Sequence, residues 1–249
     1  MAERMQKLLF EMSNEDRMRI LRRLEENSLN LSQLADSQDL HVSDAFRHLH
    51  RLSDAGLVQK DGEGQYHLTH YGQLILGQLK GIEALTKNEE YFSKCSTSML
   101  PYEFISRIGE LVEGTALATI PDELNAIEGA IKMADQYIWA MSSHNLNITN
   151  PQIIAKAKAG VNIRFIAPEG IYLPDSVAPI PTTLPGINKR ELKKVEIMIL
   201  VTDHVAGFGL PTPDGKLLTH SLVGTERRFM KWCEDLFKYY WERARPYGQ

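Results

Sequence analysis

Two arginines spaced one helical turn apart, Arg47 and Arg51, are the side chains of this sequence best suited to recognising another molecule. A guanidinium group carries a planar fork of N–H donors, which fits the O6 and N7 acceptors of guanine. At 100° per residue, the two arginines share one side of a predicted helix over residues 43–55 with other polar residues. These are Ser43, Asp44 and His50. The opposite side is apolar, so the segment is predicted to bury one face and to present the other to the major groove of double-stranded DNA.

The neighbouring residues predict the elements that hold this helix in place. Ser13 is predicted to cap a helix that ends near residue 27, and a short helix follows over residues 32–38. Ser43 is predicted as the cap of the polar helix and Gly56 as its left-handed stop. Residues 57–60 and 65–68 then form a hairpin around two glycines. Three helices followed by a hairpin are typical of a winged helix-turn-helix, the plan of many DNA-binding domains.

Further DNA contacts are predicted around this helix. Ser32 and Gln33 begin the short helix, where backbone and side-chain donors bind phosphate, and Lys60 and Gln65 lie on the wing. The alternative is that these polar groups only coat the surface. Residues 1–70 hold nine Lys/Arg and twelve Asp/Glu, so non-specific binding to phosphates should be weak and sensitive to salt.

The composition limits the class of protein. The chain has 249 residues, enough for two domains, with 43% hydrophobic and 24% charged residues and a net charge of −4. It contains no apolar run of the roughly 18–20 residues needed to span a bilayer, so a cytoplasmic protein without membrane contact is expected. Cys95 and Cys233 are its only cysteines and match neither a metal site nor a disulfide framework. We therefore expect no metal and no cofactor.

A long helix is predicted after the wing, from Thr69 to about Lys94. Its apolar residues recur every three to four positions and extend further than a small domain can cover: Leu74, Ile75, Leu79, Ile82 and Leu85. This favours pairing with a second copy in a homodimer, and the alternative is docking on the second domain. The predicted domains are thus a winged helix over residues 1–72, a linking or dimerisation helix over 73–95, and an α/β domain over 96–249.

The second domain shows helix, strand, helix and strand with short loops over residues 122–167, which is typical of a parallel α/β unit. Residues 195–202 form a further strand, and 205–210 could pair with it as a hairpin. Ligands of open α/β sheets bind beyond the carboxyl ends of the strands, here under a proline-rich loop. The polar residues expected to form such a small-molecule pocket are Ser142, Ser143, His144, Asn145, Glu169, Asp203 and His204, with Arg164 inside its strand. The alternative is that they only cap helices and form hydrogen bonds with the backbone of loops.

Two resemblances follow from these motifs. Residues 48–58 (HLHRLSDAGLV) with 66–69 (YHLT) resemble the ArsR-type winged-helix regulators, although the Cys-x-Cys pair of the metal-sensing members is absent. Residues 138–143 (IWAMSS), 159–166 (AGVNIRFI), the segment from Leu100 to Leu111 and the segment from Trp232 to Tyr240 resemble the C-terminal domain of archaeal methanogenesis-regulatory, FilR-type transcription regulators. With the winged helix, the likeness covers nearly the whole chain.

That C-terminal domain is in turn similar to the phospholipase D-like fold, which serves as a sugar sensor in other archaeal regulators. Catalysis of the phospholipase D type requires His-x-Lys-x-x-x-x-Asp, in which the imidazole is the nucleophile. Here His204 is followed by Ala206 and Pro211 in place of the lysine and the aspartate. The resemblance therefore implies an α+β winged helix-turn-helix followed by a non-catalytic, phospholipase D-like α/β domain, without catalytic residues.

The sequence as a whole predicts a dimeric transcription regulator whose effector alters the spacing of two recognition helices. Two alternatives remain open at this point. One is a protein-interaction module of the transcription machinery, in which the winged helix binds protein. The other is an enzyme related to the phosphodiesterases.

Overall fold

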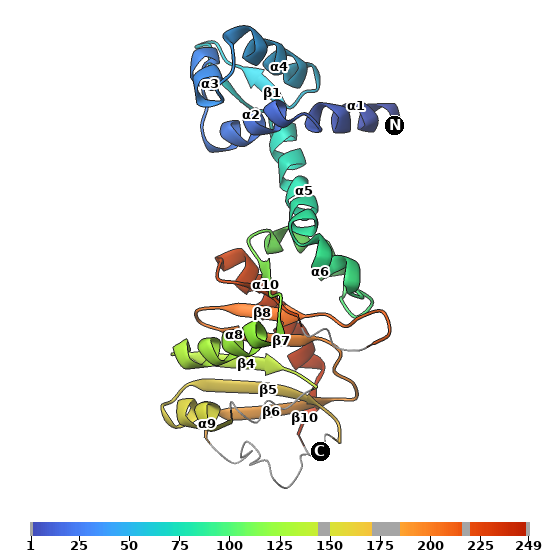
Figure 1. The fold of residues 1–249 in the computed structure, drawn as a ribbon, viewed down its shortest axis with the longest axis vertical. Helices are drawn as coiled ribbons and strands as arrows, with labels where there is room; N and C mark the ends of the chain where they lie inside the picture. The colour runs from blue at the N-terminus through green and yellow to red at the C-terminus, as the bar shows by residue number, and fades with distance from the viewer. Residues whose placement is uncertain (1, 144–149, 171–184, 216–219, 248–249) are drawn as a thin grey trace. The chain divides into compact units, whose positions relative to one another are not determined.

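The computed structural model describes residues 2–143, 150–170, 185–215 and 220–247. The chain divides into two compact units, Met1–Leu79 and Lys80–Gln249. Each unit has its own hydrophobic core, and we describe the two separately (Figure 1). No helix among the described residues has both the length and the apolar character needed to cross a bilayer.

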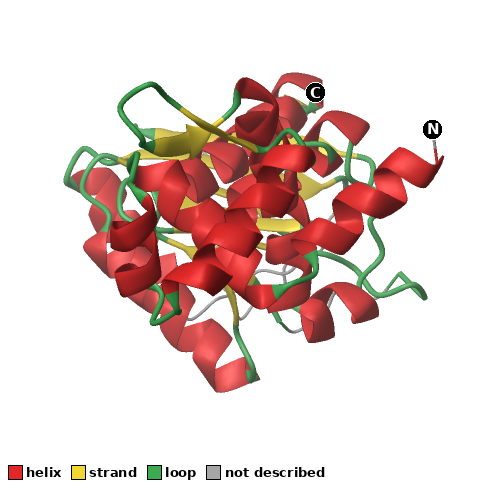
Figure 2. Ribbon diagram, turned by 90° about the horizontal axis from the view of Figure 1, so that it is seen from above, coloured by secondary structure: helices red, strands yellow, loops and turns green. Residues whose placement is uncertain are grey.

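Unit 1 is the predicted winged helix. Its helices are α1 (Ala2–Met12), α2 (Glu15–Glu26), α3 (Leu31–Ser37) and α4 (Val42–Asp54), and the wing consists of the antiparallel strands β1 (Val58–Lys60) and β2 (Tyr66–Leu68). Leu29 forms a further bridge to Tyr66, so the hairpin is held against the segment between α2 and α3. Helices account for most of unit 1, and the wing is its small sheet. Figure 2 colours the helices, strands and loops of the chain by type.

The core of unit 1 explains the orientation of α4. Ala45, Leu49 and Leu52 are fully buried, as the 100° periodicity predicts. They pack against side chains of α2, α3 and the wing, including Ile20, Leu21, Leu34, Leu57 and Tyr66. Gly56 takes the left-handed conformation (φ 74°) that ends α4 and turns the chain into β1.

Two predicted helix caps are wrong. The side chain of Asn14, not that of Ser13, accepts the capping hydrogen bond of α2, from the backbone N–H of Arg17. Ser43 lies within the first turn of α4, whose N-cap is His41. The cap differs from the predicted one by one residue in α2 and by two residues in α4. Ser43 is thereby freed from a capping role and stays exposed.

Helix α5 (His70–Lys87) begins in unit 1 and ends in unit 2, and α6 (Glu89–Lys94) follows. The prediction of one continuous helix to Lys94 is therefore wrong. The chain breaks at Asn88, a buried residue whose amide Nδ2 donates to the carbonyl of Gly114 (3.3 Å) and whose Oδ1 accepts from Ala116 N (3.2 Å). These bonds to a neighbouring segment hold Asn88 outside helical geometry, which the local sequence does not indicate.

Unit 2 contains an eight-stranded mixed sheet with the order β10-β6-β5-β4-β7-β8-β9-β3. Its strands are β3 (Thr115–Ala116), β4 (Tyr137–Met141), β5 (Asn162–Pro168), β6 (Ile187–Leu192), β7 (Met198–Thr202), β8 (Ala206–Gly209), β9 (Leu222–Gly224) and β10 (Arg245–Pro246). Strands β4, β5 and β6 are parallel, whereas β7 runs antiparallel to both β4 and β8. The predicted parallel α/β unit and the predicted β7–β8 hairpin are both confirmed.

Helices cover both faces of this sheet (Figure 1). On one face lies α10 (Arg227–Arg243), which buries Phe229, Trp232, Phe237 and their neighbours against β7 and β8. The other face carries α8 (Ile120–Met133) and α9 (Asn150–Lys158), which form a smaller core with Ile138 and Ile163. Two short helical segments, α7 (Tyr102–Ile105) and η1 (Ile108–Leu111), complete the unit. The predicted fold class, an α+β winged helix-turn-helix followed by an α/β domain, is thus confirmed.

Candidate nucleic-acid interface and the cavity of the second unit

The outward face of α4 is polar and accessible. Arg47 forms an ion pair with Asp44 (2.9 Å), one turn away, and its side chain is 67% exposed. The imidazole Nδ1 of His50 lies 3.0 Å from a carboxylate oxygen of Asp54. Surface pairs of this kind are worth about 0–1 kcal/mol. Arg47 and His50 can therefore exchange these partners for acceptors on a second molecule at small cost.

Arg51 has a different environment, although it belongs to the same helix. Its guanidinium donates two hydrogen bonds to the carboxylate of Glu11 in α1, at 2.9 and 2.8 Å, and lies over the ring of Phe10. Glu11 is 4% exposed and also pairs with the buried Arg17 at 3.2 Å. The hydrogen bond from Arg51, aided by the charge of Arg17, holds the pKa of Glu11 below its ordinary value despite its burial. Arg51 is thus committed within unit 1, and Arg47 is the more available arginine.

The sequence interpretation missed Glu11. It stands 40 positions before Arg51, and its local pattern is that of any acidic residue on an amphipathic helix. Only the packing of α1 beside α4 brings the two side chains together. Phe46 is a hydrophobic residue whose exposure the helical spacing does indicate. Phe46 is 52% exposed, since it falls about 100° from Ala45 on the helix, outside the buried arc.

The exposed Phe46 enlarges the candidate interface. Its ring lies 6.4 Å from that of His50, next to Arg47 on the outward face of α4. Val42, one turn earlier, is 51% exposed. Apolar side chains in the major groove contact the methyl group of thymine. The face therefore combines a guanidinium group, an imidazole and an apolar patch, which together could distinguish base pairs.

The remaining predicted contact residues of unit 1 are also found at the surface. Ser32 and Ser43 are exposed. Gln33 forms a reciprocal capping box with Asn30, so its side-chain carbonyl is already engaged. On the wing, the ammonium of Lys60 lies 5.4 Å from the ring centre of Tyr66. Gln65 is half-buried and donates its backbone N–H to Asp61, a bond that shapes the turn.

Of the ligand residues predicted in unit 2, Ser142 and His204 line one cavity between α8 and the sheet, and the other described ones do not. Strand β7 is antiparallel to β4, so its carboxyl end, with Asp203 and His204, lies beside the start of β4. Ser142, Ser143 and Glu169 follow the ends of β4 and β5 at the opposite edge. The expectation of a common edge is wrong, because an apolar strand pattern gives no information about strand direction. His144 and Asn145 lie outside the described residues.

Asp203, Glu169 and Arg164 contact neighbouring groups of unit 2. The carboxylate of Asp203 accepts the backbone N–H groups of Asp135 (3.1 Å) and Gln136 (3.3 Å). Burial opposes ionisation, but these N–H groups hold the pKa of Asp203 below its ordinary value. Glu169 forms an ion pair with Arg245. The guanidinium of Arg164 lies over the indole rings of Trp139 and Trp241, at 5.0 and 5.4 Å.

His204 completes a small exposed cluster. Its Nε2 lies 3.3 Å from carboxylate oxygens of both Asp135 and Asp203. Donor atoms of the three residues are within 4.8 Å of one another, a spacing that would suit a metal ion. Asp203 is already bonded to backbone N–H groups, so the cluster also has a sufficient structural role in joining β7 to the start of β4.

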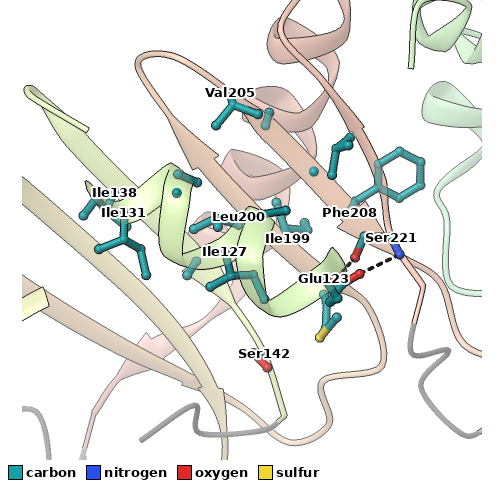
Figure 3. A pocket seen from close by; sticks show the side chains of 18 of the residues that line it. Glu123, Ile127, Ile131, Ile138, Ser142, Ile199, Leu200, Val205, Phe208 and Ser221 are labelled. Atoms are coloured by element: carbon teal, nitrogen blue, oxygen red, sulfur yellow. Dashed lines mark hydrogen bonds between the residues drawn. The ribbon is translucent and has the colours of Figure 1, made fainter. Parts of the chain in front are cut away.

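A cavity of about 360 Å³ lies between α8 and the sheet, and no sequence pattern indicated it (Figure 3). Its walls are mainly aliphatic, with Ile127 and Ile131 from α8 and Leu200 from β7. At one end the buried carboxylate of Glu123 accepts two hydrogen bonds from Ser221, from its backbone N–H (3.0 Å) and its hydroxyl (2.5 Å). The size and the lining of this cavity would suit a small apolar molecule. It shares Ser142 and His204 with the predicted pocket, whereas the other described residues of that pocket lie outside it.

Three solved structures with some similarity to this chain have low sequence identity to it. The archaeal chromatin protein TrmBL2 is 16% identical, with a TM-score of 0.46 and 94% of each chain covered. NucT from Helicobacter pylori is 12% identical, with a TM-score of 0.45, and covers 54% of this chain and 98% of its own. Nuc from Salmonella typhimurium, a phospholipase D family member, is 14% identical, with a TM-score of 0.40 over 55% of this chain and all of its own. No curated protein matches the sequence.

Two family models match the sequence itself. Residues 5–90 match the HVO_A0261 N-terminal domain, a segment that contains most of α1 and the rest of the winged helix with α5. Residues 186–243 match the middle domain of the methanogenesis regulatory protein FilR1, which here comprises β6 to α10. The two segments together span more than half of the chain. The resemblance to FilR-type regulatory proteins is thus confirmed, and the chain joins an HVO_A0261-type N-terminal domain to a FilR1-type middle domain.

Proposed function

We propose that this chain is a sequence-specific, DNA-binding transcription regulator that places α4 in the major groove. The observation that carries the proposal is the two-sided character of α4. Ala45, Leu49 and Leu52 are completely buried, whereas Arg47 and Phe46 on the other side are more than half exposed. An exposed guanidinium beside an exposed aromatic ring contributes nothing to the core of unit 1. Both groups suit base edges in the major groove.

Each candidate residue has a specific role in this proposal. Arg47 contacts a guanine, Phe46 a thymine methyl, and His50 an acceptor on a neighbouring base. Ser32, Gln33, Ser43, Asp44, Lys60 and Gln65 position the helix and the wing on the phosphates and sugars. Arg51 can reach DNA only by leaving Glu11, so we assign it a supporting role rather than the equal one that the sequence predicted.

We further propose that the regulator acts as a homodimer. Helix α5 exposes Leu74, Ile82 and Leu85 along its length, and Tyr71 lies at its start. Successive positions are separated by three or eight residues, the spacing of a helix stripe that pairs with a second copy. The segment 73–95 thus remains our candidate for the dimerisation helix. Two-fold symmetry then predicts half-sites roughly 34 Å apart, one turn of DNA.

The second unit is proposed to bind a small-molecule effector and not to catalyse a reaction. The imidazole of His204 is held between the carboxylates of Asp135 and Asp203. It lacks the lysine and aspartate at the spacing that phospholipase D chemistry needs. An effector changes DNA affinity only if it binds the two dimer geometries with different affinity.

The test begins with in vitro selection of a DNA site, followed by measurement of its affinity for Arg47→Ala. We expect a loss of about 5- to 150-fold at the selected site, equivalent to about 1–3 kcal/mol for one bidentate contact. The matched control is Arg23→Ala, because Arg23 also forms an exposed pair (with Glu26, three residues on) and its loss removes the same charge. Equal losses for both variants, or failure to select any site, would contradict the proposal. A monomer in light scattering would contradict the dimer.

A further inference from the structure

The cavity in unit 2 exists because small residues face each other across it. Helix α8 contributes Ala126, Gly129 and Ala130, and the strands contribute Ala140 and Gly207. Protein interiors normally fill such gaps by interdigitating side chains. Here the small side chains of the helix and the strands are too short to fill the gap between them. A cavity of about 360 Å³ remains, which is within the range of small-molecule sites.

The lining of the cavity determines the charge of its occupant. Among the described residues that line it, none is lysine or arginine, and five have polar side chains: Glu123, Ser142, His204, Ser221 and Thr225. An anionic ligand would meet the carboxylate of Glu123 without a compensating guanidinium or ammonium group. A sugar would leave most of its hydroxyls unpaired, which weakens binding by about 5- to 100-fold for each. The cavity therefore favours a neutral, mainly apolar molecule.

The polar end of the cavity determines where the occupant is anchored. Glu123 lies in the first turn of α8 and is 8% exposed. Its two oxygens each accept one hydrogen bond from Ser221, whereas a carboxylate offers about four lone-pair positions. A carboxylate is an acceptor only, so the group that meets it must be a donor such as a hydroxyl. Figure 3 shows this pair at one end of the cavity and Ile131 and Ile138 toward the other.

The length of the cavity limits the size of the occupant. Glu123 and Ile131 both line it and are eight residues apart on α8, which corresponds to about 12 Å at about 1.5 Å per residue. The volume holds roughly twelve groups of the size of a water molecule, at about 30 Å³ each. An elongated molecule of about ten to twelve heavy atoms matches both values.

We propose that this cavity binds a neutral, elongated apolar molecule of about ten to twelve heavy atoms, with a hydroxyl donor directed at Glu123. The inference deepens the proposed function and rests on it in one respect, since the occupant is then the effector of the regulator. It moves the effector site from the polar strand ends, where the sequence placed it, to the space between α8 and the sheet.

The test uses the full-length chain without DNA and the fluorescent neutral probe 1-aminoanthracene. Linear primary alcohols of six to sixteen carbons displace the bound probe. We expect affinity to rise about fourfold per methylene and to level off near ten or eleven carbons. Decanoate at pH 8 should bind at least tenfold more weakly than 1-decanol, and glucose should not displace the probe. Equal binding of decanoate and decanol, or affinity that keeps rising to sixteen carbons, overturns the proposal.

Variants link the binding to this cavity. Ala126→Leu fills it and should weaken decanol binding at least tenfold, whereas Asn125→Leu adds the same side chain at an exposed position of the same helix and should have no effect. Met198→Ala enlarges the cavity and should move the preferred alcohol to a longer chain. Unchanged binding in both cavity variants overturns the proposal. Because no DNA is present, this failure would be distinct from a failure of Arg47→Ala to weaken DNA binding.

Discussion

Replacement of Glu11 by glutamine tests the contact that separates the roles of Arg47 and Arg51. The carboxylate of Glu11 is the charged partner of the buried Arg17, whose side chain is 6% exposed. Removing one partner of a buried ion pair costs about 3–5 kcal/mol, since the other charge stays buried. Arg17 keeps hydrogen bonds to the carbonyls of Glu11 (2.6 Å) and Phe10 (3.0 Å). We therefore expect Glu11→Gln to destabilise unit 1 by about 2–3 kcal/mol, below the full cost of a broken pair.

Amide hydrogen exchange of the full chain can measure this loss within unit 1 alone. A loss of about 2–3 kcal/mol corresponds to exchange about 30- to 150-fold faster for the core amides of α2 and α4 that open with the whole unit. Glu26→Gln is the matched control, because Glu26 forms an exposed pair with Arg23 and its loss should change exchange little. Equal exchange in the two variants would show that the stability of unit 1 does not depend on the pair between Arg17 and Glu11. Glu11 would then be no reason to expect that Arg51 is held away from DNA.

Three further predictions follow from single residues. The pKa of Glu11 is lowered in the folded state, so its ionised form stabilises unit 1 at pH values above the ordinary pKa of 4.5. This stabilisation should disappear as the pH falls through the lower folded pKa. Glu11→Gln should therefore make stability less dependent on pH in this range, as denaturation at a series of pH values would show. Gly72→Ala should destabilise the start of α5 severely, because the added Cβ would lie 2.2 Å from the carbonyl oxygen of Leu57. The control is Gly77→Ala, where the added Cβ meets nothing within 4 Å. Thermal denaturation should give a clearly lower midpoint for Gly72→Ala than for the control. Phe46→Ala should remove the preference for thymine at one position of a selected DNA site while leaving the other positions unchanged, which repeated selection would reveal.

The periodicity of the sequence predicts the elements of unit 1 well. Ala45, Leu49 and Leu52 recur at helical spacing, and a single apolar face can be buried in only one direction. The same rule places Phe46 outside the core. For that residue, position on the helix is a better guide to burial than hydrophobicity. The ion pair of Arg51 could not be predicted, because its partner Glu11 lies 40 residues away in the sequence. Nothing in the residues around Glu11 distinguishes it from other acidic residues on amphipathic helices.

In unit 2 the sequence predicts strands but not their directions. An apolar run such as Met198–Thr202 has the same sequence pattern whether the strand is parallel or antiparallel to its neighbour. The predicted pocket depended on the direction of β7, and its residues lie at two opposite edges of the sheet instead of one. The cavity is a tertiary feature, because Ala126, Ala140 and Gly207 look unexceptional in their own segments. Only their positions opposite one another leave a space.

A route from this cavity to α5 can be followed through hydrogen bonds within unit 2. Ser221, which binds Glu123 at the polar end, precedes β9, and β9 pairs with β3. In β3, the N–H of Ala116 donates to Asn88, the residue at which α5 ends. The other end of α5 is fixed to the wing of unit 1, since Thr69 caps the helix and also donates to the carbonyl of Gly56. If the proposed ligand shifts the Glu123–Ser221 pair, it acts on the strands that hold Asn88, the residue at which α5 ends.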